Sequence, residues 1–116
     1  MKQVILNVFL CILSLPILAN ITPNQKQALI DLYQSTDGEN WNNTWDLNAD
    51  VSTWYGVSLE NGDVVALELS FNNLKGKLPE SIGQLQHLVV LNLAFNALEG
   101  ELPKSFYSLV NLKEIK

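Results

Sequence analysis

The sequence contains no arginine, one histidine and one cysteine, so the residue types that build most catalytic and metal sites are scarce. A single cysteine cannot form an internal disulfide, and no cysteine–histidine cluster has the spacing of a structural zinc site. Seven lysines against 12 aspartates and glutamates give a net charge of −5. An acidic chain is not attracted to the phosphates of nucleic acids or of anionic membranes. We therefore expect no catalytic residues, no cofactor, no metal and no nucleic-acid partner.

What is present is the composition of one small folded domain. The chain has 116 residues, of which 47% are hydrophobic and 16% are charged. That balance excludes a disordered tail, because disordered chains have low hydrophobicity and high net charge.

The first nineteen residues have the pattern of a secretory signal peptide. Lys2 precedes an almost unbroken apolar run from Val4 to Leu18, and the small residue Ala19 ends it. We expect residues 1–19 to be removed by cleavage after Ala19. The alternative is a signal anchor, although the run is shorter than the roughly 20 residues that a spanning helix needs. The sequence therefore predicts a secreted or cell-surface protein.

A segment of 24 residues occurs twice, and this repeat is the strongest signal in the sequence. The segments that begin at Val64 and Leu88 carry the same residue types at the same intervals. The matched pairs are Leu67 and Leu91, Leu69 and Leu93, Asn72 and Asn96, Leu74 and Leu98, Gly76 and Gly100, and Pro79 and Pro103. A third copy begins at Leu112 and reaches Ile115. This periodicity predicts a solenoid, in which each coil packs only against its neighbours.

Each repeated residue has a physical role. Leu67 and Leu69 alternate with polar residues, which predicts a half-buried strand in every coil and hence a parallel sheet. Asn72 follows the strand, where a buried amide can bridge backbone groups of neighbouring coils. Gly76 is suited to a turn with a positive φ. Pro79 favours an extended or 3₁₀ segment over a long helix on the returning side.

These intervals resemble the leucine-rich repeat, in the form best known from plant receptors, L-x-x-L-x-L-x-x-N-x-L-x-G-x-I-P-x-x-I-G-x-L. Leu78 and Leu102 replace the isoleucine before the prolines, and Tyr107 stands where the first copy has Gly83. The resemblance implies an α/β fold, a solenoid with parallel strands on its concave face and a helical N-terminal cap. We expect residues 64–116 to hold two full repeats and a truncated third.

Residues 20–63 are expected to form that cap, which a solenoid needs to cover its first coil. Thr22 is suited to the N-cap position of a helix and Pro23 to its first turn, while Asp37 and Gly38 are suited to its end.

The same segment resembles the cap of plant-type repeat proteins, with its Cys-x-Trp-x-Gly-Val-x-Cys element. Trp54, Gly56 and Val57 match that element, but Ser52 and Ser58 occupy the positions of its two cysteines. The cysteine-free cap is more similar to bacterial secreted repeat proteins than to plant receptors. Packing of tryptophans would have to replace the missing disulfide.

Three tryptophans, Trp41, Trp45 and Trp54, lie close together in the predicted cap. Aromatic rings bury a large apolar area each. We interpret them as a wedge between the helix and the first repeat. The alternative is an aromatic platform that binds sugar.

Two further patterns are interpreted as surface features without chemistry. The stretch from Asp46 to Asp50 has the opening spacing of a calcium loop but lacks the required glycine and glutamate at its later positions. His87 is expected to be exposed, because the sequence places no carboxylate or nucleophile beside it.

The binding surface is predicted to consist of the outward side chains of the stacked strands. The candidate binding residues are Glu68, Ser70, Asn92, Ala94 and Phe95. Phe71 and Phe95 recur at the repeat interval. We interpret this pair as a stacked spine within the solenoid rather than as a ligand contact.

The leading hypothesis is an exported, non-catalytic module that recognises a protein or peptide. The alternative is part of a ligand-sensing ectodomain of a receptor-like kinase or other signalling receptor, which would be membrane-anchored. Leu112 and Ile115 are expected to lie at an uncapped edge. An uncapped edge predicts that the chain is the N-terminal part of a longer repeat protein. The other interpretations are a truncated gene product and a chain that closes its edge by self-association.

Overall fold

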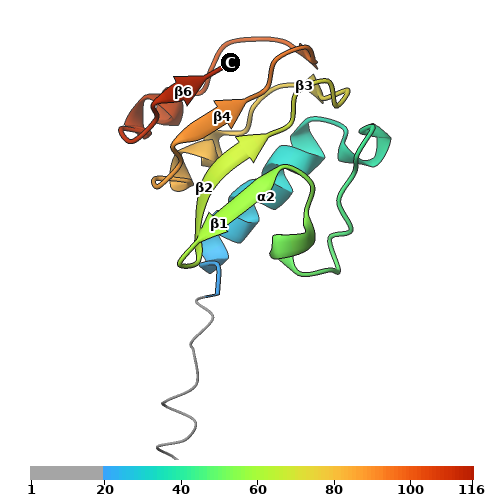
Figure 1. Ribbon diagram of the computed structural model, residues 1–116. Coiled ribbons are helices and arrows are strands. Elements are labelled where there is room, and N and C mark those ends of the chain that lie inside the picture. The colour runs from blue at the N-terminus through green and yellow to red at the C-terminus, as the bar shows by residue number, and fades with distance from the viewer. Residues whose placement is uncertain (1–19) are drawn as a thin grey trace, which may run out of the picture.

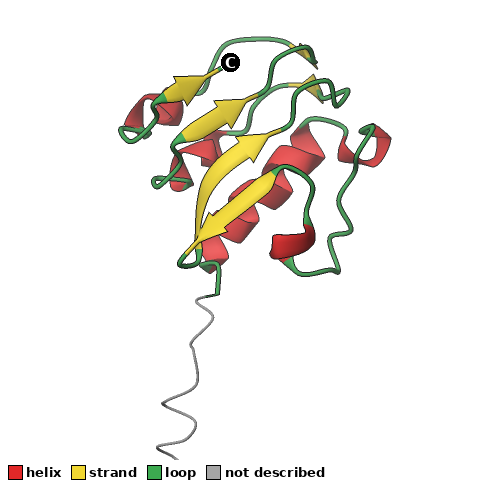
Figure 2. Cartoon of the chain, in the orientation of Figure 1, coloured by secondary structure: helices red, strands yellow, loops and turns green. Residues whose placement is uncertain are grey.

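The computed structural model describes residues 20–116, so the predicted signal peptide lies outside the described residues. The fold has two layers, a sheet and a row of helices behind it (Figure 1; Figure 2). In the order in which they pair, the strands are β1 (Val57–Glu60), β2 (Asp63–Glu68), β4 (Val90–Asn92) and β6 (Glu114–Ile115). The helical layer consists of the α-helix α2 (Pro23–Ser35) and the 3₁₀ helices η3 (Glu80–Gln84) and η4 (Lys104–Ser108).

The repeat interval of the sequence is the register of the sheet. Strands β2, β4 and β6 are parallel, with Leu67 opposite Leu91 and Leu91 opposite Ile115. A second parallel pair, β3 (Lys75–Gly76) and β5 (Ala97–Leu98), lies on the returning side of the coils. The predicted solenoid of parallel strands is therefore confirmed, and 3₁₀ helices follow the prolines as expected.

Strand β1 was not predicted, and it lies within the segment expected to be the cap. It pairs antiparallel with β2, with Val57 opposite Leu67. The connecting residues Asn61 and Gly62 have φ values of +52° and +81°. Asn-Gly with two positive φ angles is the preferred two-residue hairpin turn, so the dipeptide was a usable signal. The hairpin gives the sheet a fourth strand on the N-terminal side.

The core lies between the two layers and is built from the periodic apolar residues. Val64, Leu67 and Leu69 are fully buried from the sheet side. The helix contributes Ala28, Leu29 and Leu32, also fully buried. Its start is as predicted, because the Thr22 side chain accepts a hydrogen bond from the Gln25 backbone N–H at 3.3 Å and Pro23 begins the helix.

The repeated asparagines bridge the coils, as the sequence predicts. Asn72 is fully buried; its Oδ1 accepts from the Asn43 backbone N–H at 2.7 Å, and its Nδ2 donates to the Asn43 carbonyl at 3.2 Å. One coil later, Asn96 Oδ1 accepts from the backbone N–H groups of Asn72 and Leu74, both at 3.0 Å. Its Nδ2 donates to the Leu69 carbonyl at 2.9 Å. Each asparagine thus satisfies backbone groups of the coil on its N-terminal side.

Replacing Asn72 by alanine is expected to lower the free energy of unfolding by about 2 kcal/mol, because the buried Asn72 side chain makes two hydrogen bonds to the Asn43 backbone that would be lost. Urea unfolding followed by circular dichroism measures this change. Gln84→Ala is the matched control, since Gln84 is exposed on η3, and we expect it to be within about 0.5 kcal/mol of wild type. Equal midpoints for the two variants would contradict a bridging role for Asn72.

Candidate functional site

The side of the sheet that faces away from the helices is the candidate binding surface, called the open face below. Its side chains are those that alternate with the core residues along each strand. Glu68 is exposed, and it lies opposite Asn92 in the parallel ladder. Ser70 and Ala94 follow at the ends of these two strands and are half-buried. The structure therefore brings four of the predicted binding residues together; their role in binding stays a prediction.

The floor of the open face is apolar. Val65 and Ala66 on β2, and Val89 and Val90 on the next coil, are half-buried. Small aliphatic side chains of this kind make a shallow surface that an extended peptide chain can cross. Polar side chains adjoin this surface at both ends of the strands.

Phe71 and Phe95 stack, but the interpretation of a spine within the solenoid is wrong. Their ring centroids are 4.3 Å apart with an interplanar angle of 8°. The side chains are 65% and 73% exposed, respectively. Both residues have left-handed backbone, with φ of +53° and +57°. Because the next residue, Asn72 or Asn96, turns into the solenoid, the phenylalanine before it projects outward. Phe95 is thus accessible at the margin of the open face.

The tryptophans form a buried cluster, which confirms the wedge and contradicts the sugar platform. Trp41, Trp45 and Trp54 are each less than 5% exposed. Trp45 stacks on Trp54 with centroids 4.8 Å apart and meets Trp41 edge-on at 4.9 Å. Each indole N–H donates to a backbone carbonyl, those of Thr36, Tyr55 and Asp46, at 2.8–2.9 Å. No indole face is left for a ligand to stack on.

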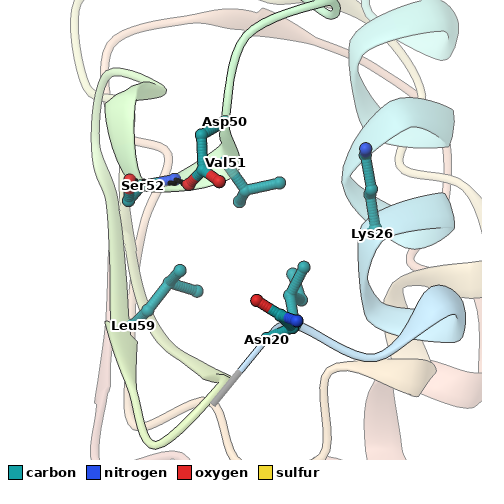
Figure 3. A pocket seen from close by; sticks show the side chains of 7 residues that line it. Asn20, Lys26, Asp50, Val51, Ser52 and Leu59 are labelled. Atoms are coloured by element: carbon teal, nitrogen blue, oxygen red, sulfur yellow. Dashed lines mark hydrogen bonds between the residues drawn. The ribbon is translucent and has the colours of Figure 1, made fainter. Parts of the chain in front are cut away.

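A hollow of about 450 Å³ lies between the start of α2 and the loop before β1 (Figure 3). Lys26 and Asp50 stand on opposite walls, and Val51 and Leu59 supply apolar surface (Figure 3). Hydrogen bonds from the hydroxyl and the backbone N–H of Ser52 lower the pKa of Asp50. Asp50 is therefore held ionised, but among residues 20–116 no ion pair joins it to Lys26.

A second hollow, of about 340 Å³, opens at the end of the open face where the strands begin. We call the polar residues around it the rim cluster. They are Glu60, Asn61, Asp63, His87, Asn111 and Lys113. His87 is exposed as predicted, with a side chain 58% accessible. Asp63, His87 and Asn111 share one position in successive coils; this relation was not predicted, although the 24-residue interval applied to Asp63 would have shown it.

A family profile described as Leucine Rich Repeat matches residues 64–85 and 87–109. A leucine-rich repeat protein from Bacteroides eggerthii shares 33% identity over 59% of this chain, with a TM-score of 0.55. The chain carries leucine-rich repeats at residues 64–85 and 87–109. The matched segments are the two full coils that carry β2 and β4, so family and fold agree on the same residues.

Two further solved structures match a larger share of this chain. The BIR2 ectodomain from Arabidopsis thaliana is 25% identical over 84% of this chain, with a TM-score of 0.66. A plant ice-binding protein is 22% identical over 84%, with a TM-score of 0.70, and shares the fold. The chain spans 12% of the Bacteroides protein, 55% of the ectodomain and 33% of the ice-binding protein. No curated protein compared with the chain matches it.

Between residues 20 and 116, no helix is long and apolar enough to cross a membrane. The same residues contain no group of three or more His, Cys, Asp or Glu side chains that could hold a metal ion.

Proposed function

We propose that this leucine-rich-repeat chain is an exported, non-catalytic module that binds a protein or peptide across its open face. The observation that carries the proposal is the accessible row formed by Glu68 and Asn92 above an apolar floor. Polar groups along the row can pair with a partner's backbone, and the floor can accept small apolar side chains. Ser70, Ala94 and Phe95 extend the same surface toward the ends of the strands.

The test is a selection of random peptides displayed on phage, using the immobilised protein as bait. We expect the enriched peptides to lose binding to Ala94→Arg by about tenfold or more, because a long charged side chain would cover the open face. The matched control is Gln84→Arg, which places the same residue on the helical side. Binding is measured by fluorescence anisotropy with synthetic copies of the enriched peptides.

Two results would overturn the proposal. One is that no peptide is enriched over several rounds. The other is that enriched peptides bind Ala94→Arg and wild type equally, which would place the contact away from the open face. A thermal melt of each variant shows that it is folded before its affinity is compared.

A receptor ectodomain is the second candidate, favoured by the likeness to the BIR2 ectodomain over 84% of this chain. Under this proposal the chain is the N-terminal part of a longer, membrane-attached protein. Intact mass of the natural protein from medium and from membranes separates the two. A species of the mass of residues 20–116 in the medium favours the free module, and a much heavier membrane species favours the receptor.

The exposed apolar residues of the last described coil support the proposal that a further repeat or a second copy of the chain covers this coil. Val110 is 83% exposed and Ile115 is 58% exposed, and β6 is the edge strand of the described sheet. Either a further repeat or a second copy of the chain would bury this surface. Sedimentation across a range of concentrations distinguishes the two, because only self-association depends on concentration.

A further inference from the structure

We infer that the rim cluster binds a lysine or arginine side chain of the partner and releases it when His87 is protonated. The inference rests on the proposed function, because the hollow opens onto the open face through Val65 and Val89. It adds to that function the chemistry of one contact and a control by pH.

Asp63 is held in position by a buried residue of the helix. Gln25 is 5% exposed, and its Nε2 donates to Asp63 Oδ1 at 3.0 Å and to Thr22 Oγ1 at 3.2 Å. Its Oε1 accepts from the Val64 backbone N–H at 2.8 Å, which fixes the amide orientation. Among the described residues, no hydrogen bond involves Asp63 Oδ2. The carboxylate is thus pre-positioned with one oxygen available, an arrangement that reduces the entropic cost of binding a cation.

The charges around the hollow favour a cation when His87 is neutral. Glu60 on β1 and Asp63 at the start of β2 provide two carboxylates, and Lys113 on the third coil provides one ammonium group. Together with Glu68, the strands β1 and β2 carry three carboxylates and no lysine. A basic side chain from a partner therefore meets a local excess of negative charge, which steers and orients it.

His87 is placed to compete for the same carboxylate. Its Nε2 lies 3.8 Å from Asp63 Oδ1, close enough for an ion pair once the imidazole is charged. A protonated His87 would balance the excess charge and repel an incoming ammonium or guanidinium group. Binding of the basic side chain is therefore expected to weaken when the imidazole gains its charge.

The floor of the hollow suits the stem of such a side chain. Val65 and Val89 are half-buried and line the hollow beside the charged groups. The methylene groups of lysine and arginine pack on apolar surface while the charged head stays with polar partners. A short cation without a stem is expected to bind less well.

The test is a titration with N-acetyl-arginine methylamide, followed by amide chemical shifts in NMR spectra at pH 7.5 and pH 5.5. We expect shifts to centre on Asp63, Val64 and His87, with affinity about two- to fivefold weaker at pH 5.5, the range of an exposed ion pair. His87→Gln is expected to keep the affinity of pH 7.5 at both pH values. Asp63→Asn is expected to weaken binding at pH 7.5, whereas Glu99→Gln, on a distant exposed turn, is not.

Three results of the titration would overturn the inference. These are shifts that centre elsewhere, equal shifts from the neutral N-acetyl-norleucine methylamide, or a pH dependence that persists in His87→Gln. The peptide selection gives an independent outcome. Open-face peptides without enrichment of lysine or arginine would leave the proposed function standing while this inference fails. Peptides that contact the rim cluster through a basic residue would support both.

Discussion

Trp45→Ala is expected to lower the free energy of unfolding by about 5 kcal/mol, at the upper end for loss of a buried aromatic side chain. Trp45 is 3% exposed and is the centre of the aromatic cluster. Its ring stacks between those of Trp54 and Tyr33, with centroid distances of 4.8 and 6.2 Å, and Trp41 meets it edge-on. Removing it leaves a cavity, breaks three aromatic pairs and deprives the Tyr55 carbonyl of its donor.

Such a loss is comparable to the whole stability of a small domain, about 5–15 kcal/mol. We therefore expect the melting temperature to fall by about 20 °C or more, as measured by circular dichroism. Trp45→Phe keeps part of the packing and is expected to lose about half as much. Tyr107→Ala is the control, because Tyr107 is 74% exposed. Its melting temperature should equal that of wild type. A Trp45→Ala melt within a few degrees of wild type would show that the cluster does not hold the cap on the repeats.

Gly76→Ala is expected to destabilise the fold by about 3 kcal/mol, and Gly100→Ala by only about 1 kcal/mol. The two glycines occupy the same position in successive coils. Gly76 has a φ of +123°, outside the left-handed helical region near +60° that other residues adopt at modest cost. A Cβ there would also overlap the backbone oxygen of Ser35, at the end of α2. The clash is with backbone, so it cannot be relieved by a change of rotamer.

Gly100 differs in both respects. Its φ is +79°, and an added Cβ would lie 2.8 Å from the Cε of Lys77, a side chain that can move aside. Urea unfolding of the two alanine variants in parallel measures the difference. Equal destabilisation would mean that the repeat conformation, rather than the docking of the helix end on the first coil, sets the requirement for glycine at Gly76.

The solenoid could be predicted because its interactions recur at a fixed interval. Recurrence at that interval indicates that two residues occupy equivalent positions in successive coils. The structure gives equivalent roles to Leu67 and Leu91 in the core, and to Asn72 and Asn96 as bridges between coils. Residues that occur once carry no such signal. Gln25 was not singled out, because nothing in the helix pattern indicates that its amide crosses to Asp63.

The candidate site was predicted in part for the same reason. The row that contains Glu68 and Asn92 followed directly from the alternation within each strand. The exposure of Phe71 and Phe95 could not be predicted in this way, because apolar residues that recur at the repeat interval are typical of core positions. Burial there is decided by the left-handed turn before the inward asparagine, which a pattern of residue types does not specify. His87 was expected to lack a carboxylate partner, and the sheet register supplies one in Asp63.

The asparagine bridges all point toward the N-terminal side, and this direction has a consequence for local unfolding. Asn43 and Asn72 are each anchored by the asparagine of the coil that follows. Loss of a coil therefore frees backbone amides of the coil before it, so opening is expected to spread from β6 toward α2. Hydrogen exchange should therefore show the lowest protection at β6 and increasing protection toward α2. The rim cluster draws Lys113 from the last described coil, so any ligand that orders this coil would slow exchange far beyond its own contacts.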